Sequence, residues 1–171
     1  ISPMHTLCDQ LLRKIHRSNR YKNYNAVQTI MSIQMYPQYW INQKIVQVPS
    51  NLRAPLKLGE YASVMELVDA KTQQFKWLKE YKIAHQRLES QRNEFDKKLI
   101  KLNEKFEVIQ GIIMWKYLRV VPKKGDANHT WFIPFQVDTA ASLQVLSYIS
   151  LIDEGAKKHN FTKAESVLKK I

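Results

Sequence analysis

The stretch LKEYKIAHQRLESQRNEFDKKLIKLNEKFEVIQGII, residues 78–113, decides the fold class of this 171-residue chain. Eleven of its positions follow one another at alternating steps of three and four residues, and nine of the eleven are apolar or aromatic. Such heptad spacing is typical of a helix that buries one continuous seam. The seam positions are Leu78, Tyr81, His85, Leu88, Arg92, Phe95, Leu99, Leu102, Phe106, Ile109 and Ile113. We therefore predict a heptad-patterned helix whose seam packs against a protein neighbour.

The region that contains the seam, residues 60–118, has no proline and a single glycine, Gly111. A helix over the whole region would be roughly 75–90 Å long at about 1.5 Å per residue, which exceeds the width of a small domain. The helix must therefore project, straight or bent, or fold back as a hairpin near Gln73 or near residues 89–91. Of these alternatives we favour one long helix.

Two members of the seam are polar. A polar residue in a coiled-coil seam costs stability and can fix register or partner. If Arg92 has that role, Arg92→Leu is expected to raise thermal stability and loosen the choice of partner. The alternative is that His85 and Arg92 extend past the seam to solvent or to an acid such as Glu89.

The segments before the seam predict short helices followed by an extended arm. Apolar residues recur at helical spacing over residues 4–18 and 25–35. Residues 36–59 then contain three prolines, which remove hydrogen-bond donors and fix backbone angles. We interpret residues 36–59 as an extended arm, with a short strand at 44–48 as an option.

The segments after the seam predict a β-hairpin and two helices. Runs of β-branched and aromatic residues at 116–121 and 130–137 flank a turn-rich linker. A helix is expected from residue 138 or 139 to 152, ended by Gly155, and a last one from Thr162, where Glu165 completes capping-box spacing. The predicted fold is thus mainly α, with three parts: a basic arm (1–59), the heptad helix (60–118), and a small β-hairpin with C-terminal helices (119–171).

Positive charge is concentrated at the two ends of the chain, whose formal net charge is +12. Residues 1–59 hold eight basic and one acidic residue. Residues 60–110 hold ten basic and nine acidic residues, and residues 111–171 hold nine basic and five acidic residues. A segment with an excess of positive charge attracts phosphate or acidic surfaces, whereas a segment with balanced charges keeps a helix solvated without attracting polyanions. Aromatic residues alternate with the N-terminal cations, and unpaired bases stack on aromatic faces. An equally good interpretation is a solvated helix face with its tyrosines in the core.

These charges give a set of candidate RNA contacts. They are Arg13, Lys14, Arg17, Arg20, Tyr21, Lys22, Lys44, Arg53, Lys57, Lys123 and Lys124.

The sequence contains no recognisable catalytic or metal-binding motif. Its five histidines form no His-x₃-His pair, and it has only four glycines, too few for glycine-lined phosphate loops. We therefore expect no catalytic residue, cofactor, metal or small-molecule substrate. The sequence has no run of 18 apolar residues, so no transmembrane helix is predicted. The lone Cys8 favours an intracellular setting, with the mitochondrial matrix preferred and any targeting peptide upstream of Ile1.

Two functions fit these observations. The first is a non-catalytic structural subunit of a ribonucleoprotein, best a mitochondrial ribosomal protein, that contacts rRNA through its basic ends and neighbouring proteins through the long helix. The second is a coiled-coil scaffold or adaptor subunit of a protein-only complex, which could dock on a membrane surface. Basic proteins with arms, a long helix and no active site suit the first setting, by analogy of architecture alone.

Overall fold

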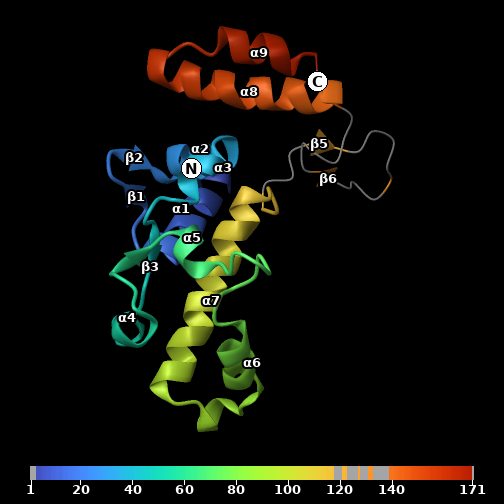
Figure 1. Ribbon diagram of the computed structural model, residues 1–171. Coiled ribbons are helices and arrows are strands. Elements are labelled where there is room, and N and C mark those ends of the chain that lie inside the picture. The colour runs from blue at the N-terminus through green and yellow to red at the C-terminus, as the bar shows by residue number, and fades with distance from the viewer. Residues whose placement is uncertain (1–2, 118–120, 123–126, 128–130, 133–138, 171) are drawn as a thin grey trace. The chain divides into compact units, whose positions relative to one another are not determined.

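The computed structural model describes residues 3–117, 121–122, 127, 131–132 and 139–170 (Figure 1). The protein is mainly helical, as predicted, and divides into two compact units, residues 1–114 and 115–171. The helices of the first unit are α1 (Pro3–His16), α2 (Ala26–Met35), α3 (Pro37–Trp40), α4 (Ser50–Leu56), α5 (Val64–Leu67), α6 (Leu78–Gln86) and α7 (Glu94–Ile113), with a 3-10 turn η1 (Glu89–Gln91). Its antiparallel strand pairs are β1 (Arg20–Tyr21) with β2 (Tyr24–Asn25), and β3 (Val46–Gln47) with β4 (Tyr61–Ala62).

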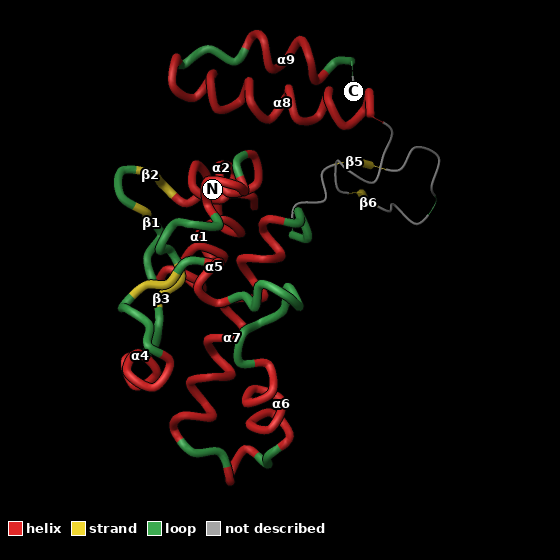
Figure 2. The backbone as a smooth tube through the Cα atoms, in the orientation of Figure 1, coloured by secondary structure: helices red, strands yellow, loops and turns green. Residues whose placement is uncertain are grey.

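The heptad region folds back on itself instead of forming one helix. Figure 2 shows α6 beside the first half of α7, with the chain reversing between them. The reversal is fixed by a capping box in which Asn93 Oδ1 accepts from the Asp96 N–H at 2.8 Å and Asp96 Oδ2 accepts from the Asn93 N–H at 3.3 Å. Arg87 also pairs with Asp96, at 2.5 Å. A new helix start inside the heptad pattern therefore overrides its continuity. The favoured single helix over the whole region was wrong, and the alternative of a hairpin near residues 89–91 is confirmed, with α7 as its long helix.

Arg92 holds the end of α6 and does not act as a seam residue. Its guanidinium donates to the carbonyl oxygens of Ala84 at 3.2 Å, His85 at 2.9 Å and Arg87 at 3.1 Å. These carbonyls have no partner within α6, because the last turn of a helix leaves its C=O groups free. The polar residue in the pattern thus closes the hairpin.

The C-terminal half of the seam belongs to the core of this chain. Leu99, Leu102, Phe106 and Ile109 on α7 are at most 2% exposed, and α7 packs against α1, α2, α4, α5 and α6. These four side chains are therefore unavailable to another protein. Among the other seam positions, Leu78, Tyr81, Arg92, Phe95 and Ile113 are partly buried, and only His85 and Leu88 are exposed.

The predicted arm at 36–59 is folded into the first unit. Ile45, Val46, Val48 and Leu52 are fully buried, and the expected short strand is present as β3. Two of the prolines open helices, since Pro37 is the first residue of α3 and Pro49 is the N-cap of α4. The first turn of a helix needs no N–H from its leading residue, so proline is tolerated there. The prediction of an extended arm was therefore wrong.

The second unit contains the predicted β-hairpin and helices. β5 (Val121–Pro122) pairs with β6 (Trp131–Phe132), and the helices are α8 (Thr139–Lys158) and α9 (Thr162–Leu168). Gly155 does not end α8, which continues to Lys158 with the exposed ion pairs Lys157–Asp153 and Lys158–Glu154 along its last turns. A Cβ at Gly155 would meet the Phe161 ring at 2.7 Å, so this glycine permits the close return of the chain before α9.

Candidate anion-binding pocket

Three lysines occupy one side of α7. Lys98, Lys101 and Lys105 are three and four residues apart, so each lies about one turn beyond the last on the same helix face. The adjacent apolar side of α7, about 100° around the helix axis, is anchored in the core by Leu99, Leu102 and Phe106, as described above. Because that apolar side is buried, the lysine face has a fixed direction.

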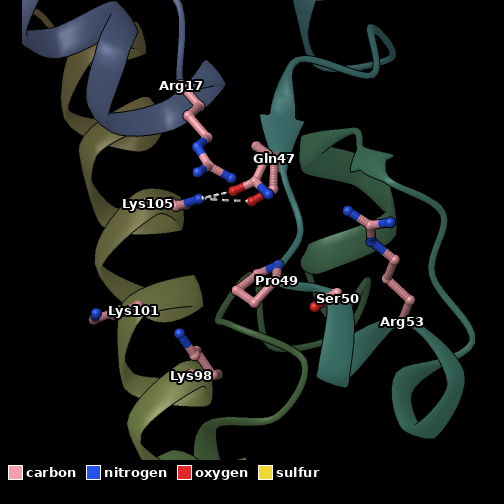
Figure 3. Close-up of a pocket in the computed structure, with 8 residues that line it drawn as sticks. All are labelled: Arg17, Gln47, Pro49, Ser50, Arg53, Lys98, Lys101 and Lys105. Atoms are coloured by element: carbon pink, nitrogen blue, oxygen red, sulfur yellow. Dashed lines mark hydrogen bonds between the residues drawn. The ribbon is translucent and has the colours of Figure 1, made fainter.

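The lysine face borders a pocket of about 340 Å³ that lies wholly within the first unit. Its other walls come from the residue after α1 and from the β3–α4 segment (Figure 3). The lining residues are Arg17, Gln47, Pro49, Ser50, Arg53, Lys98, Lys101 and Lys105. Five of these eight residues are basic and none is acidic. The fold thus gathers like charges from three distant parts of the sequence.

Lys105 is the most enclosed cation of the pocket. Its Nζ donates to the Gln47 carbonyl oxygen at 2.9 Å and to Gln47 Oε1, and Figure 3 shows Arg17 reaching toward the same glutamine. Burial, followed by the positive charges of Arg17, Lys101 and Lys98, lowers the pKa of Lys105 from 10.5 to about 8. The pocket therefore lacks negative charge that would hold a proton on this lysine.

The cations of the pocket differ in their hydrogen-bond and ion-pair partners. Arg53 donates to the Val48 carbonyl oxygen at 3.2 Å and lies 3.9 Å from Glu60. Within the described part of the chain, no carboxylate forms an ion pair with Arg17, Lys98, Lys101 or Lys105. Four cations thus line a shared volume without an ion-pair partner, and an anion is the ligand that such a site attracts.

Arg17 reaches the pocket from an unusual backbone position. It follows the last residue of α1 with a φ of 65°, and its N–H donates to the Arg13 carbonyl oxygen at 2.9 Å. Glycine is the usual residue at such a left-handed helix end, because a Cβ there costs free energy. The backbone conformation at this position therefore does not explain why an arginine stands there.

The predicted RNA contacts are distributed unevenly around this pocket. Only Arg17 and Arg53 line it. Tyr21 is 7% exposed between the rings of His16 and Trp40, so it cannot stack on a base. Lys44 pairs with Glu66 at 3.4 Å. Exposed residues outside the pocket are Arg13, Lys14, Arg20, Lys22 and Lys57. The predicted contacts Lys123 and Lys124 lie outside the described residues.

Sequence reasoning missed Lys98, Lys101 and Lys105. They belong to residues 60–110, where basic and acidic residues nearly cancel in number. In space the cancellation is only partial, because Glu94 and Glu104 line a neighbouring pocket that Lys98 and Lys101 also border, whereas no acid lines the pocket that contains Lys105. The signal that could have found them is the spacing of three and four residues between lysines.

No family model matches this chain, and no curated protein resembles it significantly in sequence. Over the residues that the structure places, no group of three or more His, Cys, Asp or Glu side chains could hold a metal ion. Over the same residues, no helix combines the length and apolarity that crossing a membrane requires.

Proposed function

We propose that this chain is a non-catalytic RNA-binding subunit of a ribonucleoprotein, and that the pocket between α1, the β3–α4 segment and α7 contacts the phosphate backbone. The observation that carries the proposal is the group of four cations, Arg17, Lys98, Lys101 and Lys105, without a carboxylate partner among the described residues. Phosphate contacts by Lys and Arg supply most of the sequence-independent affinity of RNA-binding proteins.

The spacing of the lysines also suits a polyanion. Lys98 and Lys105 are seven residues apart on α7, which places them about 10 Å apart along the helix axis. A row of that length, flanked by Arg17, offers cations to more than one phosphate of a strand. A single small anion would leave part of the row without a partner.

The second proposed partner is a neighbouring protein, which would contact a smaller surface than the full seam. The α6 end of the hairpin exposes Ile83 at 46% and Leu88 at 67%, so it is the part of the heptad region that an adjacent subunit can cover. The protein-only scaffold is not favoured, because four of the eleven seam side chains are buried in the chain's own core and five more are partly buried. The mitochondrial ribosome stays a prediction from composition; purification from the native source with identification of the accompanying RNA tests it.

The proposal is tested by the salt dependence of RNA binding. The double variant Lys98→Ala/Lys101→Ala removes two pocket charges and keeps a good helix former at both positions. We expect its slope of log K against log salt to fall in magnitude by about 1.4–1.8, at 0.7–0.9 per phosphate contact. The matched control is Lys79→Ala/Lys82→Ala, which removes two exposed charges from α6, away from the pocket. Equal slopes for the two double variants would contradict the proposal.

A further inference from the structure

One cation of the pocket, Lys105, lies among the other four. Lys105 is partly buried, and its ammonium is held against two oxygens of Gln47. The charged groups that surround it are Arg17 from the end of α1, Arg53 from α4, and Lys98 and Lys101 from its own helix. Every charge that lines the pocket therefore repels a proton on Lys105.

We propose that Lys105 takes up a proton when the pocket binds an RNA phosphate, so that RNA affinity falls as the pH rises above neutrality. This inference rests on the proposed function, because it concerns the same pocket. A phosphate beside Lys105 supplies the negative charge that the lining residues lack, and it thereby favours the ammonium over the neutral amine. Binding of the anion and binding of the proton are then linked, and each strengthens the other.

The acceptors already present explain why the pocket alone does not hold the proton firmly. Gln47 offers a carbonyl oxygen and an amide oxygen, and its Nε2 donates to the Val48 carbonyl oxygen at 3.3 Å. Both acceptors are neutral dipoles, which stabilise an ammonium less than a formal negative charge does. Glu104, which precedes Lys105 in the chain, lines a neighbouring pocket together with Lys98 and Lys101, but it does not line this one. The missing charge must come from a ligand.

The size of the effect follows from the free pocket. The pKa of Lys105 is about 8, so roughly nine-tenths of the molecules carry the proton at pH 7 and one-tenth at pH 9. If only the protonated pocket binds, the apparent dissociation constant rises by about tenfold over that interval. At pH 8, about half a proton is taken up for each RNA bound.

The experiment measures the affinity for oligoadenylate without a terminal phosphate between pH 6.5 and 9, at constant ionic strength. Wild type is expected to lose about tenfold between pH 7 and 9. Lys105→Arg keeps its charge throughout, so it should bind at every pH as wild type does at pH 7. Lys105→Gln has no proton to gain, so its affinity should be independent of pH and lower than the wild-type value at pH 9, where about one-tenth of the wild-type molecules still carry the proton. Calorimetry at pH 8 in buffers of different ionisation enthalpy should show proton uptake by wild type alone.

The matched control is Lys101→Arg, which makes the same exchange one turn away on α7 and should retain the wild-type pH dependence. A constant wild-type affinity from pH 7 to 9 would overturn the inference while leaving the proposed function in place. A pH dependence that persists in Lys105→Arg would overturn it too, because another group would then be titrating. Absence of RNA binding at every pH would instead overturn the proposed function.

Discussion

Replacement of Arg17 by glycine separates the role of its backbone from the role of its side chain. The φ of 65° at Arg17 costs an L-residue about 1–2 kcal/mol. Glycine removes that cost, and the greater freedom of glycine in the unfolded chain takes back about 0.5–1 kcal/mol. Arg17→Gly should therefore stabilise the first unit by about 0.5–1 kcal/mol, a rise in Tm of roughly 2–6 °C.

The same substitution should weaken RNA binding. Loss of one phosphate contact lowers the salt slope by about 0.7–0.9, which corresponds to about 5- to 8-fold in affinity at 0.1 M salt. Lys57→Gly is the matched control, because Lys57 has a φ of 55° at the end of α4, is exposed and lies outside the pocket. It should raise the Tm similarly and leave the affinity nearly unchanged.

Thermal unfolding and fluorescence anisotropy on both variants check the reasoning. A stabilised Arg17→Gly protein that binds RNA as wild type does would refute the assignment of the pocket. A variant that loses stability together with affinity would show that Arg17 supports the fold, and the backbone argument would then be wrong. Only gain of stability with loss of binding fits a residue kept for its charge.

Two further substitutions test the architecture of the heptad region. Leu99→Ala should lower the free energy of unfolding by about 2–5 kcal/mol in urea titrations, because Leu99 is fully buried in the chain's own core. If stability were unchanged and sedimentation showed an altered oligomeric state, Leu99 would instead belong to an interface with a partner. Arg92→Leu should lower the free energy of unfolding by about 1–2 kcal/mol, since it removes the charged donors from the Ala84, His85 and Arg87 carbonyls. A rise in Tm would mean that these contacts do not hold the hairpin.

The positions of α1 and α2 could be predicted from the sequence because each of these helices buries an apolar face. Residues 4–18 and 25–35 match α1 and α2 to within two residues. The heptad pattern could not reveal what lies against the seam, since apolar spacing is the same whether the partner is another chain or the same one. Asn93 and Asp96 carry the missing information, because their capping-box spacing starts a helix in the middle of the pattern.

The pocket could be predicted only in part, for a physical reason. Arg17 and Arg53 stand in a basic segment, and net charge alone points to them. Lys105 stands beside Glu104, and a count along the chain cancels the two. A helix separates neighbouring residues by about 100° around its axis, so adjacent opposite charges can face different surfaces. Linear charge therefore finds cations in loops and short helices, but it misses a lysine face on a long helix.

The pocket also relates stability to binding in a way that distinguishes it from the core. Its like charges repel one another in the absence of an anion, which disfavours the folded state; burial first, and this repulsion second, lower the pKa of Lys105. Neutral substitutions in the pocket therefore relieve repulsion while they weaken binding, whereas a cavity in the core weakens both. RNA bound to the folded state alone removes the repulsion and stabilises the first unit by mass action. Opposite changes in stability and affinity are thus the signature of the pocket, because no purely structural cluster of lysines would link the two.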